Sequence, residues 1–171
     1  MVSFAQEKND DIISIREVVT AAFGRTSEAK LVEAIRNSRN FIPELSIVAT
    51  EKGNLLGHIL LSPIPIEAQG QTFSALALAP LAVIPTRQRE GIGTELVKVA
   101  LSKCRELDHN LVVVLGHPKY YPRFGFQTAN QFGIRAPFPV PEQAFMVLEI
   151  QQGALQRSSG LVRYPAYFNE V

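Results

Sequence analysis

The sequence lacks the features that mark secreted, membrane-spanning and nucleic-acid-binding proteins. Its one cysteine, Cys104, cannot form a disulfide within the chain. The longest apolar stretch, Ala75–Ile84, has ten residues and contains Pro80, whereas a membrane helix needs about 20. The 17 basic and 16 acidic side chains nearly balance, so the basic excess typical of nucleic-acid binding is missing. The segment Met1–Asp11 is polar, with no apolar signal-peptide core. We expect a cytoplasmic protein with no membrane and no nucleic-acid partner.

What the chain does have is the length and composition of one globular domain. Its 171 residues fall in the range of about 100–200 that is typical of a domain. Apolar residues make up 46% and charged residues 19%, as in ordinary globular proteins. A chain of this size buries about 70% of its unfolded surface, so its core needs no disulfide or metal. The three histidines show no metal-ligand spacing. We expect a single domain spanning residues 1–171 that holds no metal.

Hydrophobic periodicity predicts both helices and strands along the chain. A helix is expected over about 91–107, followed by a strand at 111–115 that is rich in valine and therefore buried on both faces. A helical connection between two strands makes them parallel, so strands 73–84 and 111–115 should pair in parallel. This order predicts an α+β fold with a mixed sheet. The other expected strands lie near residue 4, at 45–50, at 55–63, near residue 132 and at 144–151, and the other helices at 12–23, 27–35 and 118–124.

The segment richest in chemical information is the turn that joins strand 73–84 to the following helix. Gly91 and Gly93 open that helix. The first N–H groups of a helix lack partners and carry its positive dipole end, so they suit a phosphate group. Glycine lets the backbone approach the anion because it has no Cβ. Arg87 and Arg89 add positive charge, and the turn is therefore a candidate site for a phosphorylated ligand.

Three glycine-rich motifs compete for this turn. The Walker A loop requires Gly-Lys-Ser/Thr, which is absent. The dinucleotide fingerprint requires a third glycine where Leu96 stands. The remaining pattern is Gln-x-x-Gly-x-Gly, at Gln88–Gly93. Here the chain resembles the GNAT superfamily of acyltransferases, whose pyrophosphate motif is Arg/Gln-x-x-Gly-x-Gly/Ala.

A second motif follows strand 111–115 and strengthens the resemblance. The family has a short helix there with Tyr-x-x-x-Gly-Phe, and Tyr121–Phe126 matches it in place and spacing. The end Ser158–Pro165 is similar to the tail of a subgroup of bacterial predicted acetyltransferases, so the resemblance covers essentially the whole chain. It implies a GNAT-like twisted mixed sheet of about six to seven strands with about four flanking helices and central strands splayed at the cofactor site.

The resemblance also implies acetyl-CoA as co-substrate and transfer of the acetyl group to a primary amine of a small molecule or peptide. Tyr121 stands at the family position of the general acid that protonates the departing thiolate. The base is open among Glu44, His58, His117 and water, with Glu44 the first choice. Phe23, Phe41 and the proline-rich segment 137–141 are candidates to line the acceptor pocket, although Phe23 has the pattern of a core residue. The residues expected to bind the cofactor are Leu81, Ala82, Val83, Gln88, Arg89, Glu90, Gly91, Ile92, Gly93 and Thr94.

Two alternative functions remain open besides that of an acetyltransferase. One is a noncatalytic acyl-CoA-binding or regulatory module on the same fold, and the other is an interaction protein whose glycine turn only starts a helix. Cys104 lies on the apolar face of helix 91–107 and is expected to be structural rather than nucleophilic. The identity of the acceptor and the choice between monomer and homodimer are left open by the sequence.

Overall fold

Two long strands, β3 (Asn54–Ala68) and β4 (Gln71–Val83), link the two units into which the chain divides. The computed structural model describes residues 1–171. The first unit contains residues 1–62, 79–103 and 167–171, and the second contains residues 63–78 and 104–166. The strands are hydrogen-bonded in the order β1-β2-β3-β4-β5-β8-β6, while β9 pairs with β3 and β7 beside this path. This mixed sheet with four α-helices confirms the predicted α+β class.

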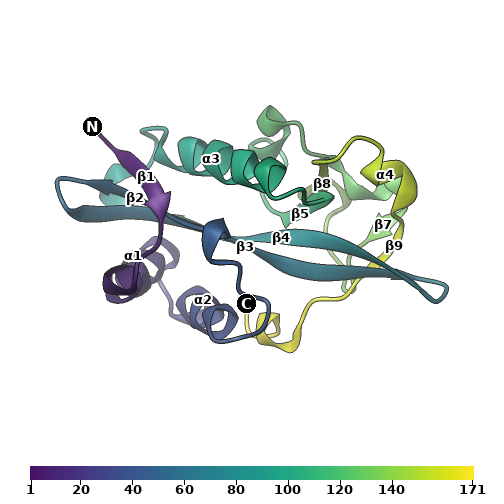
Figure 1. The fold of residues 1–171 in the computed structure, drawn as a ribbon, viewed down its shortest axis with the longest axis horizontal. Coiled ribbons are helices and arrows are strands. Elements are labelled where there is room, and N and C mark those ends of the chain that lie inside the picture. Colours follow the sequence, from purple (N-terminus) through teal and green to yellow (C-terminus); the bar gives the residue numbers. More distant parts are fainter. The chain divides into compact units, whose positions relative to one another are not determined.

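In the first unit, antiparallel strands carry helices on both faces. β1 pairs with β2, and β2 pairs with β3 through a register shift between Ala49 and Thr50. Helices α1 and α2 cover one face of these strands, and α3 covers the other (Figure 1). The bounds are β1 Ser3–Gln6, α1 Ile12–Phe23, α2 Ser27–Arg36, β2 Ser46–Glu51 and α3 Ile92–Glu106, the last turn of α3 belonging to the second unit.

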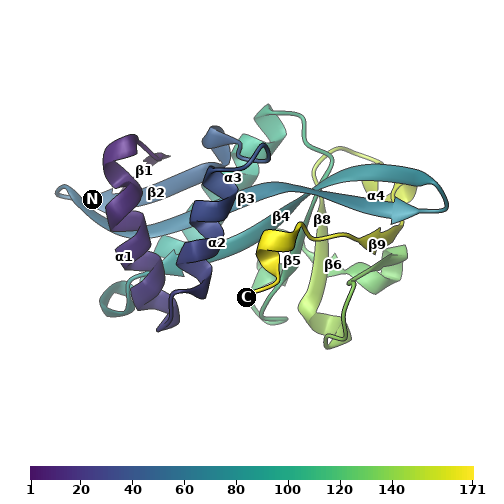
Figure 2. The same ribbon diagram turned by 90° about the horizontal axis from the view of Figure 1, so that it is seen from below.

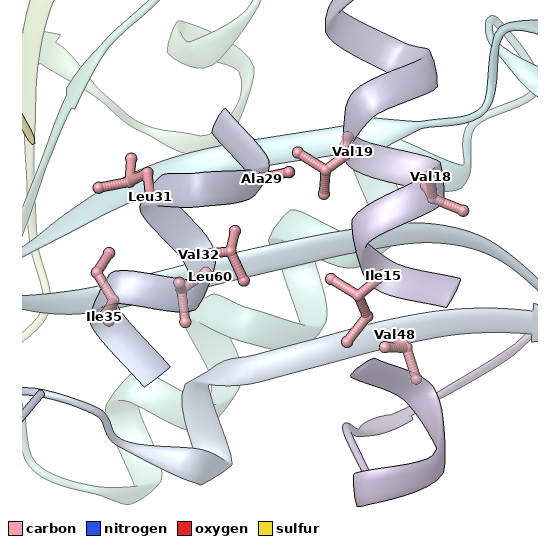
Figure 3. Close-up of a cluster of buried hydrophobic side chains, with 10 residues drawn as sticks. Ile15, Val18, Val19, Ala29, Leu31, Val32, Ile35, Val48 and Leu60 are labelled. Carbon is pink, nitrogen blue, oxygen red and sulfur yellow. The ribbon is translucent and has the colours of Figure 1, made fainter. Parts of the chain in front are cut away.

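The core of the first unit forms where α1 and α2 lie side by side across the strands (Figure 2). Each helix repeats its apolar residues at intervals of three and four, so one stripe of each faces the sheet. Val48 of β2 and Leu60 of β3 belong to the same cluster, Val48 beside Ile15 and Leu60 beside Val32 (Figure 3). Full burial of such a side chain contributes about 1.5–3 kcal/mol. The buried residues of this cluster are Ile15, Val18, Val19, Ala29, Leu31, Val32, Ile35, Val48, Leu60 and Ala82.

In the second unit, β4 and β5 pair in parallel, which confirms the crossover predicted from the sequence. Leu76 and Ala77 lie opposite Val112 and Val113. On its other side β5 pairs with β8 in antiparallel register, and β8 also pairs with β6. The predicted splaying of the central strands beyond this point stays a prediction. The bounds are β5 Leu111–Leu115, β6 Gln127–Thr128, β7 Ile134–Arg135, β8 Phe145–Glu149, α4 Ala154–Arg157 and β9 Gly160–Val162.

The sequence predictions were wrong mainly where the elements are very short. The helix predicted over 118–124 is a single 3-10 turn, Tyr121–Phe124, since Pro118 and Pro122 leave little room for α-helical hydrogen bonds. Phe132 ends another 3-10 turn, and the nearby strand is β7, two residues further on. The strands β6 and β9 have no counterpart among the expected strands and raise the total to nine, above the six to seven expected.

No helix of the structure is long and apolar enough to cross a membrane. Whether residues 1–171 act as the single domain predicted above stays a prediction.

Candidate functional site

The end of β4 and the turn after it carry ten of the predicted site residues, all in the first unit. Ala82 is buried, and Leu81 and Val83 are partly exposed. The side-chain amide of Gln88 donates a hydrogen bond of 3.0 Å to the carbonyl of Val83. Beyond the strand, the backbone N–H of Ile84 donates to Leu56 O of β3 at 2.9 Å. Gln88 thus closes the turn onto the strand from which it departs.

The turn presents an exposed cation and the first N–H groups of a helix. Arg89 is exposed and has a φ of 66°, in the left-handed region that side chains rarely adopt. Gly91 follows with a φ of 87°, a value that glycine adopts without steric cost. The first intrahelical bond of α3 runs from Glu95 N to Gly91 O. The N–H groups of Ile92 and Gly93 therefore have no partner within the helix and suit an anion.

Arg87, predicted to supply charge to an anion, is bound to two carboxylates of this chain instead. Its guanidinium donates to Glu51 at 3.0 Å and to Glu90 at 2.9 Å. The hydrogen bond from Arg87 lowers the pKa of the Glu51 carboxyl, and both carboxylates raise the pKa of Arg87. Arg89 takes no part in these contacts. Arg87 therefore ties the turn to the end of β2, and Arg89 is the cation left for a ligand.

A glycine of β3 holds α3 close to the sheet. Cβ on Gly57 would lie 2.9 Å from the carbonyl oxygen of Ala82 and 3.0 Å from Cδ1 of Leu96. Both distances are shorter than side-chain contacts normally allow. The absence of a side chain at Gly57 therefore permits the close approach of β3 to the end of β4 and to the first turns of α3. Gly57 thereby fixes the position of the helix start relative to β4.

Tyr121 lies in the second unit, at the start of the 3-10 turn after β5. Its side chain is only 8% exposed. The ring packs edge-on against Tyr120 and Phe126, with centroid distances of 5.1 and 5.6 Å. Burial raises the pKa of the phenol well above its usual value. The hydroxyl therefore keeps its proton at neutral pH, as a general acid must.

The residues around Tyr121 have other partners. Tyr120 lies under the guanidinium of Arg123, which is 4.3 Å from the ring centroid. His117 is exposed, and its Nδ1 accepts a 3.3 Å hydrogen bond from the backbone N–H of Lys119. The carbonyl of His117 accepts the N–H groups of both Tyr120 and Tyr121, so this residue shapes the turn that presents Tyr121.

The candidate bases of the first unit differ in access to solvent. Glu44 lies in the 3-10 turn Pro43–Leu45 before β2 and is partly exposed. His58 of β3 is completely buried. Desolvation lowers its pKa to about 4, the nearby Glu7 carboxylate opposing and the Arg36 guanidinium adding to this effect. A histidine without solvent access cannot take a proton from an amine that arrives from solvent.

His58 belongs to a buried polar network that sequence reasoning missed. Arg36 at the end of α2 donates two hydrogen bonds, of 2.8 and 3.0 Å, to Glu7. The hydroxyl of Ser46 also donates to Glu7 and lies 2.8 Å from Nε2 of His58. Because that hydroxyl proton is already used, Nε2 of His58 carries the proton of this bond. Nδ1 is then an unprotonated, buried nitrogen without a hydrogen-bond partner. The four residues of this network are separated by up to 51 positions in the sequence, so no local sequence pattern predicts it.

The remaining sequence predictions have mixed outcomes. Cys104 is fully buried, and desolvation raises the pKa of its thiol to about 12, which is consistent with the expected structural role. Phe23 is 40% exposed, so its expected place in the core was wrong: it is the last residue of α1 and lies beyond the stripe that faces the sheet. Phe41 packs at the edge of the α1–α2 core. The segment 137–141 contributes to a pocket of about 310 Å³ in the second unit, whose polar members include Arg135 and Glu142.

Comparison with known proteins identifies the family. Residues 4–129 match the model of the acetyltransferase (GNAT) domain. The chain belongs to the GNAT acetyltransferase family. It is 40% identical over 134 residues to the uncharacterized N-acetyltransferase YjhQ of Escherichia coli K12, covering 78% of this chain and 74% of YjhQ. It is 34% identical over 160 residues to the uncharacterized N-acetyltransferase YhbS of the same strain, covering 93% of each chain.

Solved structures of GNAT proteins extend the likeness to nearly the whole chain. The crystal structure of YhbS from Escherichia coli in complex with CoA matches with a TM-score of 0.90 at 32% identity, covering 98% of this chain and 92% of YhbS. A GNAT acetyltransferase from Brucella melitensis in complex with acetyl-CoA matches with a TM-score of 0.81 at 32% identity and covers 99% of both chains. The predicted resemblance to the GNAT family is thereby confirmed.

Proposed function

We propose that the chain is an N-acetyltransferase that moves the acetyl group of acetyl-CoA to a primary amine. The observation that carries this proposal is the helix start after β4, where the N–H groups of Ile92 and Gly93 lie beside Gly91 and the exposed Arg89. These groups suit the pyrophosphate of CoA in charge and in steric access. Two relatives that are 32% identical were solved with CoA or acetyl-CoA, which supports the same ligand here.

In the proposed binding mode, the segment Leu81–Val83 receives the pantetheine arm and the turn Gln88–Thr94 receives the pyrophosphate. Backbone N–H groups of Leu81–Val83 would stabilise the oxyanion that forms when the thioester carbonyl is attacked. Glu90, whose carboxylate is held by Arg87, contributes through its backbone. No residue of the enzyme needs to form a covalent intermediate, because the amine attacks the thioester directly.

The chemical step then requires one base and one acid. The nitrogen lone pair of the acceptor attacks the thioester carbon, the carbon–sulfur bond breaks, and the thiolate takes a proton. The nitrogen, which became cationic on attack, loses its extra proton to water to give the amide, and the acid that protonated the thiolate regains a proton from water. We assign that proton to Tyr121, whose phenol stays neutral at pH 7 because burial raises its pKa. A lysine-like amine, with a pKa of about 10.4, must first lose a proton. We assign that role to Glu44, which is partly exposed.

The test measures acetyl-CoA consumption as free thiol across a panel of primary amines, amino acids and peptides. Tyr121→Phe removes only the hydroxyl and should lower kcat by about 10²–10⁴-fold, the usual range for a general acid. Tyr120→Phe is the matched control, an adjacent tyrosine that should keep kcat. CoA should raise the melting temperature of the wild type and of both variants by mass action.

Each outcome has a distinct meaning. Turnover that Tyr121→Phe abolishes while CoA still binds supports the enzyme and names the acceptor class. A wild-type kcat in Tyr121→Phe removes Tyr121 from the mechanism. CoA binding with no turnover on any acceptor favours the noncatalytic acyl-CoA-binding module, and absence of any CoA-dependent stabilisation rejects the proposal altogether.

A further inference from the structure

Gly116, the first residue after β5, lies directly against the ring of Tyr121. Cβ on Gly116 would lie 2.9 Å from Cδ2 of the tyrosine and closer still to Cε2. Real side-chain atoms essentially never approach a ring this closely, since interiors are packed to van der Waals contact. The aromatic ring therefore occupies the space in which any other residue would carry its side chain.

The need for glycine here is a matter of space and not of backbone conformation. Gly116 is not among the glycines with positive φ, so its backbone would accept any residue. Alanine at this position is excluded only by the neighbouring ring. The effect of such a substitution would consequently act on Tyr121 rather than on the path of the chain.

The ring of Tyr121 is enclosed by neighbouring aromatic side chains and is almost completely buried. Phe126 meets it edge-on at 5.6 Å and Tyr120 at 5.1 Å, and only 8% of the residue is exposed. The backbone of Gly116 is itself anchored, because its N–H donates a 2.9 Å hydrogen bond to the carbonyl of Ala144, next to β8. The ring of Tyr121 is thus in contact with an anchored backbone segment and with two aromatic rings, which restrict its orientation.

We propose that Gly116 is a positioning residue that sets the orientation of the Tyr121 phenol for proton transfer. This inference rests on the proposed function, because it assumes that the hydroxyl of Tyr121 protonates the leaving thiolate. A positioned acid loses much of its effect when it is displaced by about 1 Å. Alanine at position 116 should therefore impair the chemical step and leave the binding of acetyl-CoA largely intact.

The first arm of the test needs no acceptor. The protein is labelled with ¹³C at Cζ of its four tyrosines, and the resonances are assigned with single Tyr→Phe variants. In Gly116→Ala the Tyr121 resonance should shift or broaden, while those of Tyr164 and Tyr167 stay in place and report an intact fold. Leu115→Ala, a change at the exposed neighbour, should leave all four resonances unchanged.

The second arm is a double-mutant cycle on acetyl transfer, with the best acceptor from the amine panel. Gly116→Ala should lower kcat by about 10- to 100-fold, with KM for acetyl-CoA within about twofold of wild type. In the Tyr121→Phe background, where no hydroxyl remains to be positioned, the same substitution should change kcat by less than about twofold. Leu115→Ala should keep the wild-type kcat.

The outcomes separate this inference from the function on which it rests. An unmoved Tyr121 resonance, or an equal loss of kcat from Gly116→Ala in both backgrounds, would overturn the positioning role and leave Tyr121 as the acid. A Tyr121→Phe enzyme with full kcat would overturn the acid itself, and the positioning role with it.

Discussion

The buried histidine of β3 predicts a specific acid sensitivity of the folded chain. Desolvation lowers the pKa of His58 from 6.5 to about 4. In the unfolded chain the imidazole is charged below about pH 6.5. Between these two pKa values, His58 is protonated in the unfolded state and neutral in the folded state. Acidification therefore favours unfolding. The stability is fully present above pH 6.5 and is lost as the pH falls from there toward 4.

The expected magnitude follows from the gap between these two pKa values. A gap of about 2.5 pKa units corresponds to about 3 kcal/mol over the full range, at about 1.4 kcal/mol for each unit. Between pH 7.5 and pH 5 the loss should reach about 2 kcal/mol. Glu7 acts at lower pH: burial raises its pKa, but hydrogen bonds from Arg36 and Ser46 bring it below 4.5. Partial burial also lowers the pKa of His109, which adds to the loss in the same direction.

The assay is urea unfolding at a series of pH values, followed by circular dichroism because the chain has no tryptophan. His58→Leu should flatten the dependence of the unfolding free energy on pH between 7.5 and 5. His117→Gln, a change at an exposed histidine, should keep the wild-type dependence. We compare the slopes of the unfolding free energy against pH, because a substitution that changes stability equally at every pH leaves this slope unchanged. Equal slopes for wild type and His58→Leu would refute the reasoning.

Two further predictions concern the turn and the packing behind it. Arg89→Gln should weaken CoA binding several-fold at low salt, and the deficit should shrink at high salt, as expected for an exposed cation. Isothermal titration at two salt concentrations measures this, and a salt-independent deficit would contradict the role. Gly57→Ala should destabilise the fold by about 1–3 kcal/mol, because Cβ would press on the carbonyl of Ala82 and on Leu96. A melting temperature equal to that of the wild type would contradict this prediction. It would show that the sheet and α3 shift to accommodate the added Cβ without loss of stability.

Sequence periodicity predicted the elements that bury one continuous stripe or run. Helix α1, helix α2, helix α3 and strand β5 were expected within about two residues of their observed ends. The two-residue strand β7 lies two residues beyond the strand expected near residue 132, and β6 escaped prediction, because a pair of residues has no period. They exist because β8 and β9 offer them backbone partners, and that information is not local in the sequence.

The candidate site likewise has features that a local sequence pattern predicts and features that depend on residues far apart in the sequence. The turn after β4 could be singled out from the sequence because glycines at fixed spacing form a short motif there. Its proposed role in binding CoA depends on backbone N–H groups, which such a motif marks. The role of Arg87 was not predictable, since its partner Glu51 lies 36 positions away. The buried network of Glu7, Ser46 and His58 is equally nonlocal, and burial alone turned His58 from a candidate base into a core residue.

The charge pattern of the turn explains why its glycines matter more than its basic residues. Arg87 pairs with Glu51 and Glu90, and Glu51 also pairs with the terminal ammonium of Met1 at 3.5 Å, so these four groups carry no net charge. Arg89 then adds only one exposed cation, whose attraction for a phosphate is screened by salt. Attraction must then come mainly from the N–H groups and dipole at the start of α3. Affinity for CoA should accordingly depend more on the geometry around Gly91 than on any one cation.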